Sequence, residues 1–468
     1  MDTTNKNKKL ISYSVVRILA DDINFNWKIP FQLNEPFKGQ GTGFFIDKEY
    51  ILTCSHVVSD SKNIYIEIPS KNSGKYHCEL ISICPYFDIA LLKTKDFKSK
   101  YYVKLGDSDK LKTGLKVDVV GYPVGFNKSN NMSNNLKFTS GIISGMQNKY
   151  IQTDSPINPG NSGGPLFSKG FVIGINGSKL VGTDLENIGF SIPINNYKII
   201  KDDLLKNKIV YRPNLLMSYN NTDKILVQNI TNKKIDHGIL IANIFDNSIL
   251  KNTGLKKGSI LSELDGFKLD NYGLSNKKWL DTNMNINIIL SKFKNNETIN
   301  IKYYNKGKAE TSKIKLEPFK PFVRTIYPVL EKVDYMVLGG MIFMNLTQNH
   351  IMSDDLKLLC NVFLKDNDYY KPKLFISYIF PNSKVNILNN LKINDLIVNV
   401  NGHKVNSVKG FIKYLSKPIT INGIKYISIE NAEGKSFLMS ISEIIEQDLI
   451  FSKIYNYELS KFHRKYMK

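Results

Sequence analysis

The chain has 468 residues, more than one hydrophobic core usually serves, so two or three domains are expected. Hydrophobic residues make up 42% and charged residues 23%, which excludes a mainly disordered chain. A net charge of +22 would suit an anionic partner such as nucleic acid. The lysines are spread along the chain, however, so we expect no specific nucleic-acid partner.

The cysteines form neither a disulfide framework nor a Cys/His spacing typical of zinc, so we expect no metal and no cofactor. The four are Cys54, Cys78, Cys84 and Cys360. Their small number favours a reducing compartment. The first ten residues lack the apolar core of a signal peptide, and no apolar run is long enough to span a membrane. We therefore expect an intracellular, cytoplasmic protein, in a cell or in a cell infected by a large virus.

Residues 13–192 consist of short β-branched and apolar runs broken by Gly, Asn, Asp and Pro. This pattern predicts an all-β barrel or sandwich. Residues 195–208 carry apolar side chains at helical spacing and predict a closing helix. Further on, residues 238–266 and 374–402 share one order: a strand, a short helix, a basic turn, a second strand and an Asp-Gly or Asn-Gly turn. This repeat predicts two copies of one small module, the second more divergent.

The run Asn158 to Pro165 reads Asn-Pro-Gly-Asn-Ser-Gly-Gly-Pro and has the features of a nucleophile loop. Glycines on both sides of Ser162 permit a sharp turn that exposes the hydroxyl group. The same turn can direct the amides of Gly160 and Ser162 toward one oxyanion, with Asn161 between them. A tight surface loop is the alternative interpretation.

Of the six histidines, His56 alone lies in a compact apolar run that begins a turn, residues 51–58. Asp88 precedes the apolar strand 89–92, where a carboxylate is costly to bury unless it is paired. A hydrogen bond to the His56 imidazole would supply that partner, although a turn-capping role for Asp88 is equally open. The order His56, Asp88, Ser162 is that of the chymotrypsin arrangement.

These segments, together with Gly41 to Ile46 and Val120 to Pro123, resemble the Deg/HtrA family of ATP-independent serine proteases. Finer details resemble its plant-type branch, including Asn24 to Phe31 and Met336 to Leu346. The resemblance implies a mainly β fold: a chymotrypsin-like double β-barrel in residues 1–210, followed by PDZ-like α+β domains in 211–320 and 321–468. It also implies a homo-oligomer, a trimer or a multiple of trimers. Phe25, Trp27 and Phe31 are candidates for that contact, although packing within one subunit is the simpler account.

The resemblance implies an endopeptidase that cleaves unfolded or damaged proteins in protein quality control. The base of its primary specificity pocket falls at Pro156, between Ser155 and Ile157, and the lack of an acid there favours small or medium apolar side chains. The stretch Leu215, Leu216, Met217 resembles a PDZ carboxylate-binding loop, but Leu216 replaces the usual glycine, which argues against peptide binding there. The alternative function is a proteolytically silent PDZ scaffold or holdase chaperone.

Overall fold

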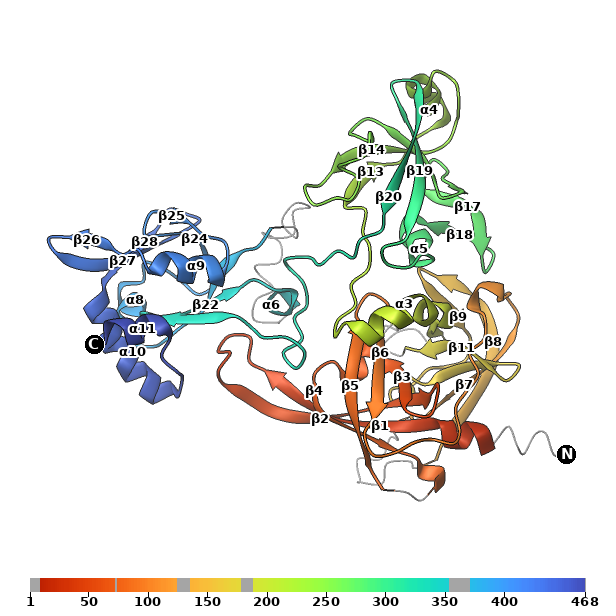
Figure 1. Ribbon diagram of the computed structural model, residues 1–468, viewed down its shortest axis with the longest axis horizontal. Helices are drawn as coiled ribbons and strands as arrows, with labels where there is room; N and C mark the ends of the chain where they lie inside the picture. The colour runs from red at the N-terminus through yellow and green to blue at the C-terminus, as the bar shows by residue number, and fades with distance from the viewer. Residues whose placement is uncertain (1–8, 72–73, 124–134, 178–187, 353–370, 468) are drawn as a thin grey trace. The chain divides into compact units, whose positions relative to one another are not determined.

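The computed structural model describes residues 9–71, 74–123, 135–177, 188–352 and 371–467. It divides into two compact units (Figure 1). The first comprises residues 1–22 and 36–320, and the second comprises residues 23–35 and 321–468. The short segment 23–35 thus packs with the C-terminal part of the chain, although it is flanked by strands of the first unit. Cys360 lies outside the described residues.

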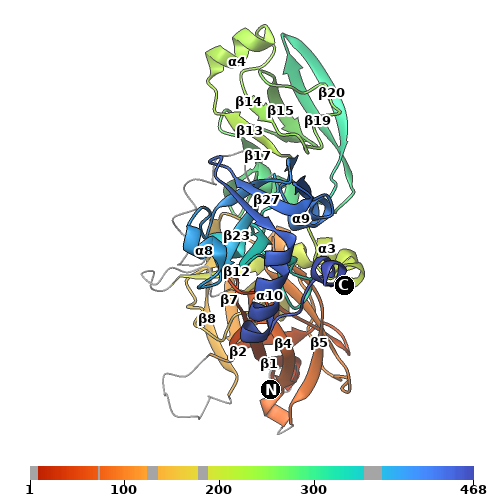
Figure 2. The same ribbon diagram turned by 90° about the vertical axis from the view of Figure 1, so that its left-hand side faces the viewer.

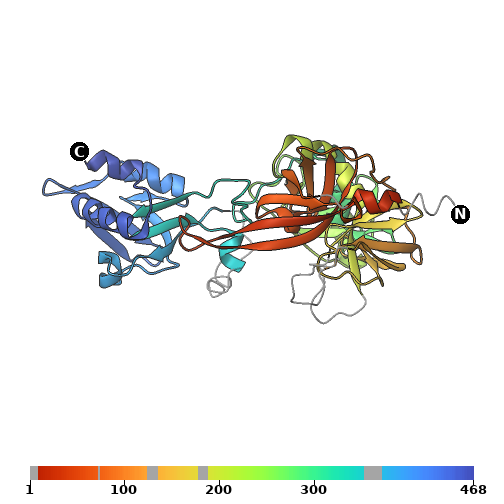
Figure 3. The same ribbon diagram turned by 90° about the horizontal axis from the view of Figure 1, so that it is seen from below.

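Two closed six-stranded barrels begin the first unit, which confirms the predicted chymotrypsin-like architecture. The first barrel has the order β1-β2-β3-β6-β5-β4 and the second the order β10-β11-β12-β9-β8-β7. Strands β1 and β2 form a long hairpin, drawn in red in Figure 3. The first barrel's strands are β1 Val15–Phe25, β2 Leu33–Phe45, β3 Tyr50–Cys54, β4 Ser61–Glu67, β5 Tyr76–Cys84 and β6 Ile89–Thr94. Those of the second are β7 Lys116–Gly121, β8 Lys137–Gln147, β9 Tyr150–Thr153, β10 Pro165–Ser168, β11 Phe171–Asn176 and β12 Gly189–Pro193.

Short helices accompany the barrels, and a longer one follows them. The helix predicted over 195–208 is confirmed as α3 (Ile194–Lys206), which packs on β5 and β11. Its buried face carries Tyr197, Ile200 and Leu204, at the three- and four-residue spacing of one helix side. The short elements are α2 Ser55–Val58 and the 3₁₀ turns η1 Pro69–Lys71 and η2 Ser108–Lys110.

The rest of the first unit is a small α+β module built on a sheet of order β13-β14-β15-β19-β20. Strands β19 and β20 form a long hairpin, and α4 lies near one end of the sheet (Figure 2). The elements are β13 Met217–Asn220, α4 Lys224–Thr231, β14 Ile239–Ile244, β15 Ile260–Leu264, β16 Phe267–Lys268, β17 Leu274–Trp279, β18 Thr282–Asn285, α5 Ile286–Ser291, β19 Thr298–Asn305 and β20 Lys308–Lys315.

The second unit holds a sheet of order β21-β22-β23-β24-β27-β26, with β25 beside β24 and β28 beside β27. Its strands are β21 Tyr335–Leu338, β22 Met341–Asn345, β23 Leu374–Ile379, β24 Leu396–Val400, β25 His403–Lys404, β26 Ile419–Ile421, β27 Ile424–Asn431 and β28 Ser436–Ser440. Its helices are α6 Gln348–Met352, α8 Lys384–Leu388, α9 Val408–Leu415, α10 Ile441–Tyr455 and α11 Lys461–Tyr466.

The predicted repeat is visible in the two modules. Strands β14 and β15 of the first correspond to β23 and β24 of the second, and each pair is followed by a tight turn. Both turns have two successive residues of positive φ, Asp265 and Gly266 at 45° and 79°, and Asn401 and Gly402 at 51° and 80°. Two left-handed residues in a two-residue turn match the right-handed twist of a hairpin.

Aromatic side chains join the segment 23–35 to the C-terminal part of the second unit. The Phe31 ring lies 5.2 Å from that of Tyr457 and 6.5 Å from that of Phe380. The Trp27 ring meets that of His350 edge-on at 5.1 Å. Packing within one chain therefore accounts for Trp27 and Phe31. Among the described residues, no helix combines the length and hydropathy needed to cross a bilayer.

Candidate active site

The first barrel brings His56 and Asp88 together through two neighbouring strands. Strand β3 ends at Cys54, and α2 begins at the next residue, so His56 lies in the first turn of this helix. Asp88 directly precedes β6, which pairs antiparallel with β3 so that Cys54 lies opposite Ile89. This register therefore places the start of α2, with His56, beside Asp88, the residue just before Ile89.

His56 and Asp88 are joined by two hydrogen bonds. The Nδ1 atom of His56 lies 2.6 Å from Asp88 Oδ2, and the His56 amide donates to Asp88 Oδ1 at 2.9 Å. The Ser55 amide donates to the Asp88 carbonyl oxygen at 3.1 Å. Asp88 therefore caps α2, whose N-cap residue Cys54 forms no side-chain cap. The turn-capping and imidazole-orienting interpretations of Asp88 both apply.

Asp88 adopts a left-handed conformation with φ of 58°. This region is unfavourable for most side chains but is visited by Asp and Asn. The conformation lets one residue present both its carboxylate and its carbonyl oxygen to the start of α2. About a fifth of each side chain is exposed, 18% for His56 and 20% for Asp88, so the imidazole is open to solvent on one side.

The loop that carries Ser162 lies against the end of β3. The Thr42 amide donates to the Ser162 carbonyl oxygen at 2.9 Å, and the Gly163 amide donates to Asn176 O at 2.7 Å. Gly163 has a φ of 84°, and a Cβ atom there would lie 2.9 Å from the Cys54 amide nitrogen. Only glycine allows this close approach, which holds Ser162 beside the residues that lead into His56.

The turn before Ser162 is fixed by its own hydrogen bonds. The Asn161 amide donates to Asn158 O at 3.0 Å, and the Gly164 amide donates to Asn161 O at 3.0 Å. Thr42 Oγ1 donates to Gly160 O at 2.7 Å, and Gly160 has a φ of 93°. The Asn161 amide is therefore engaged within the turn.

The segment predicted to form the specificity pocket is well ordered by its neighbours. Ser155 is fully buried, and its hydroxyl donates to Thr139 O at 2.8 Å. Ile157 is buried, whereas Pro156 is partly exposed. Gly189 of β12 lies close by, since a Cβ atom there would be 2.4 Å from Ser155 O and 2.8 Å from Ile157 Cγ1. The Ser155 hydroxyl already has a hydrogen-bond partner, and Ile157 and Gly189 are apolar. This segment therefore has a largely apolar character.

Side chains that the motifs did not indicate surround the His56–Asp88 pair. Burial, followed by the nearby Asp88 charge, raises the pKa of the Cys54 thiol well above its usual range, and Cys54 Sγ donates to Asn176 O at 3.2 Å. Burial and Asp88 likewise raise the pKa of Tyr150 to about 12. Burial lowers the pKa of Lys149, while Cys84 and Asp88 oppose that shift. Their spacing in the sequence carried no signal for these contacts.

One set of side chains in the described part of the chain could contact a metal ion. The ligand atoms of Cys54, His56 and Asp88 lie within 4.8 Å of one another. This set contains the His56–Asp88 pair, and the third member, Cys54, is fully buried, which raises the pKa of its thiol well above the usual range. His56 and Asp88 are therefore already engaged with each other, and the Cys54 thiol with Asn176 O.

The loop before β13, predicted to resemble a PDZ carboxylate-binding loop, has the backbone conformation that a glycine would adopt. Leu216 has a φ of 47° and is almost fully buried, as is Leu215, while Met217 begins β13. The Leu216 amide, however, donates to Asn214 Oδ1 at 2.8 Å. A bound carboxylate would have to compete for this amide.

A comparison with protein families identifies residues 41–175 as a trypsin-like peptidase domain. The chain is 30% identical over 305 residues to "Serine protease Do-like HtrA" of Bacillus subtilis, a match covering 60% of this chain and 64% of that protein. It is 31% identical over 311 residues to "Probable periplasmic serine endoprotease DegP-like" of a Marinomonas species, covering 62% and 60%. The chain thus spans less than two thirds of the length of these relatives.

A solved structure, "HtrA-type protease AlgW with tripeptide", superimposes with a TM-score of 0.51 at 22% identity, covering 68% of this chain and 97% of that one. At this identity the likeness concerns the fold alone. The double barrel and the family comparison define a trypsin-like serine peptidase domain. The sequence relatives agree with the resemblance predicted from the motifs: the chain is similar to Deg/HtrA serine proteases over 60% of its length.

Proposed function

We propose that the chain is an ATP-independent serine endopeptidase that cleaves unfolded or damaged proteins in protein quality control. The observation that carries the proposal is the pair of hydrogen bonds between His56 and Asp88, formed in a trypsin-like domain whose Ser162 loop lies against the same strand end. An imidazole held by a carboxylate at Nδ1 leaves Nε2 to act as a base.

In the proposed mechanism His56 removes the hydroxyl proton of Ser162, which attacks the scissile carbonyl carbon and forms a tetrahedral intermediate. Asp88 stabilises the imidazolium that results. The amides of Gly160 and Ser162 are the proposed oxyanion donors, because the Asn161 amide already donates to Asn158 O. One such donor contributes about 3–4 kcal/mol to transition-state stabilisation. The imidazolium then protonates the leaving amine, and water releases the acyl group from Ser162 by the same steps.

We further propose that small or medium apolar side chains are preferred at the cleavage position. Ser155, Pro156 and Ile157 would line this pocket, with Gly189 packed directly against Ser155 and Ile157. The buried Ser155 hydroxyl already has a partner in Thr139 O, so it does not favour a polar substrate group. Such apolar residues are exposed in unfolded proteins, which supports the proposed substrate class. A homo-oligomer and an intracellular, cytoplasmic location stay predictions from the sequence.

The test is degradation of casein by the wild-type chain, by Ser162→Ala and by Ser140→Ala, which removes an exposed hydroxyl from β8. We expect turnover without ATP that is lost in Ser162→Ala and retained in Ser140→Ala. Labelling with a fluorophosphonate probe, read by intact mass, detects an activated serine even if turnover is slow. Folded wild-type protein with neither turnover nor labelling would favour the scaffold or holdase instead.

A further inference from the structure

The turn of residues 85–88, here called the Asp88 turn, needs support from outside itself. Asp88 has a φ of 58°, and its amide donates to Pro85 O at 3.3 Å, longer than a typical backbone hydrogen bond. A residue other than glycine persists in this conformation only where its surroundings fix it. Phe87, the preceding residue, is fully buried, so a group that packs on its ring also fixes the backbone that leads into Asp88.

Arg212, from the segment that follows α3, packs on the Phe87 ring. Its guanidinium carbon lies 5.2 Å from the ring centre, within the range of a cation–π contact. Only 5% of Arg212 is exposed, and a guanidinium stays charged when it is buried. A cation that has lost its water gains more from an aromatic ring face than an exposed cation does. The Phe87 ring therefore offsets part of the cost of burying this charge.

The guanidinium is held in place by oxygen atoms at the end of α5 and just after it. It donates to Phe293 O at 2.5 Å, to Asn295 Oδ1 at 2.6 Å and to Leu290 O at 3.4 Å. All three acceptors are uncharged, so these bonds fix the planar group without neutralising it. The Arg212 guanidinium thus keeps its charge and its direction toward the Phe87 ring.

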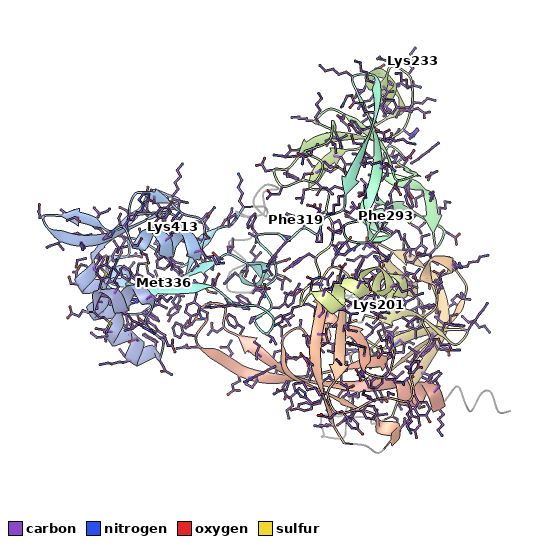
Figure 4. The ribbon with its side chains drawn as sticks, viewed as in Figure 1. Lys201, Lys233, Phe293, Phe319, Met336 and Lys413 are labelled. Atoms are coloured by element: carbon purple, nitrogen blue, oxygen red, sulfur yellow. The ribbon has the colours of Figure 1, made fainter. Side chains whose placement is uncertain are left out.

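The main chain of Arg212 is fixed as well. Two residues earlier, the Val210 amide donates to Ile83 O at 2.8 Å, so this segment runs beside the end of β5, just before the Asp88 turn. The Phe319 amide donates to Arg212 O at 3.2 Å. Both Phe293 and Phe319 are labelled in Figure 4. Contacts that do not involve the Asp88 turn therefore place Arg212 next to it.

We propose that Arg212 is a positioning residue for the peptidase reaction. Its guanidinium holds the Phe87 ring, and the ring holds the Asp88 turn in the conformation that lets Asp88 contact the amide and the Nδ1 atom of His56. The catalytic consequence rests on the proposed function, whereas the geometry can be measured without turnover. A residue outside the trypsin-like segment 41–175 thereby contributes to the geometry of the triad.

The first experiment follows hydrogen exchange by mass spectrometry in the full chain carrying Ser162→Ala, which prevents cleavage of the protein by itself. The readout is exchange at the Ser55 and His56 amides, which donate to Asp88. In Arg212→Met, which removes the charge and the hydrogen bonds, we expect this exchange to be about tenfold faster, because exchange reports local opening.

Lys292→Met is the matched control. The Lys292 ammonium lies over the Trp279 ring at 4.4 Å and binds Asp109, so this variant also removes a cation–π contact between the same module and the barrels. We expect exchange at the two reporter amides to stay at the parent rate. Unchanged exchange in Arg212→Met, or an equal rise in Lys292→Met, would overturn the proposal. If Arg212→Met fails to fold, Phe87→Leu replaces it, with the same expected rise and the same contradiction.

The second experiment measures the catalytic consequence in the chain with Ser162 intact. Arg212→Met should lower kcat for a chromogenic peptide about tenfold with little change in KM, because a catalytic group is displaced and the substrate pocket is not. A double-mutant cycle with Asp88→Asn, read by the rate of fluorophosphonate labelling, tests whether the effect passes through Asp88. In the Asp88→Asn background we expect Arg212→Met to slow labelling by less than about twofold.

The two experiments separate this inference from the proposed function. An equal loss of labelling rate in both backgrounds would show that Arg212 acts without Asp88 and would overturn its positioning role. A folded wild-type chain with neither turnover nor labelling would contradict the proposed function. Hydrogen exchange at Ser55 and His56 would then still decide whether Arg212 fixes the Asp88 turn.

Discussion

The ammonium group of Lys149 lies 3.9 Å from the centre of the Tyr86 ring and donates a hydrogen bond to the Tyr86 carbonyl oxygen. Lys149 lies between β8 and β9 of the second barrel, whereas Tyr86 lies in the turn of the first barrel that ends at Asp88. This cation therefore links the two barrels two residues before the proposed catalytic carboxylate.

We expect Lys149→Met to lower kcat/KM for a chromogenic peptide by about 10- to 100-fold, because small displacements of a catalytic group have effects of this size. Methionine keeps most of the side-chain volume but loses the hydrogen bond and the cation–π contact. Lys112→Met, at an exposed position, is the control and should be neutral. Equal activity of the two variants would show that Lys149 does not position Asp88.

Asp88→Asn tests the orienting carboxylate with little change in shape. Asparagine tolerates the φ of 58°, so the turn and the cap on α2 should persist. The uncharged amide cannot stabilise the imidazolium, so we expect kcat to fall about 10⁴-fold. Steady-state kinetics and a circular dichroism spectrum check this prediction. A folded variant within tenfold of wild type would contradict the proposed triad.

The substitution Leu216→Gly should have two opposing effects on the free energy of unfolding. Glycine would relieve the left-handed conformation, a gain of about 1–2 kcal/mol. Losing a buried leucine side chain costs about 2–5 kcal/mol, so we expect a net destabilisation of about 1–3 kcal/mol. Urea unfolding followed by Trp279 fluorescence, in a Trp27→Phe background, measures it. A variant as stable as its parent would mean that the left-handed strain at Leu216 equals the burial gain.

Acid should weaken the second unit through His350. Burial lowers the pKa of His350 to about 3, against about 6.5 in an unfolded chain. Between these values the unfolded state binds the proton and the folded state does not, so stability falls as pH decreases through this window. From pH 6.5 to pH 5 we expect a loss of about 2 kcal/mol.

Trp27 reports this transition, because its ring meets that of His350 edge-on. Urea midpoints at the two pH values should differ for the wild type and differ less for His350→Asn. The comparison isolates His350 from the other titrating groups, which both chains share. An identical pH dependence in both chains would exclude His350 as the cause.

Much of the architecture follows from local sequence, and some of it does not. The Ser162 loop and the Asp-Gly and Asn-Gly turns are contiguous, so glycine conformation and strand periodicity predict them. The hydrogen bond from the Gly339 amide to Asp448 Oδ2 joins residues 109 positions apart, and Asp448 is one acidic residue of an ordinary amphipathic helix. At Leu216 the sequence shows only that leucine replaces the usual glycine, whereas the left-handed backbone and the hydrogen bond from its amide to Asn214 Oδ1 are visible only in the structure. Such effects arise from tertiary packing.

The division of the second unit between residues 23–35 and 321–468 constrains how the molecule is made. At typical translation rates, Trp27 and Phe31 leave the ribosome roughly 20–90 s before the last residues of the chain that encloses them. During that interval the tip of the β1–β2 hairpin has no partner to cover its aromatic side chains. Phe31 can therefore reach the rings of Phe380 and Tyr457 only after the C-terminal part of the chain has been synthesised.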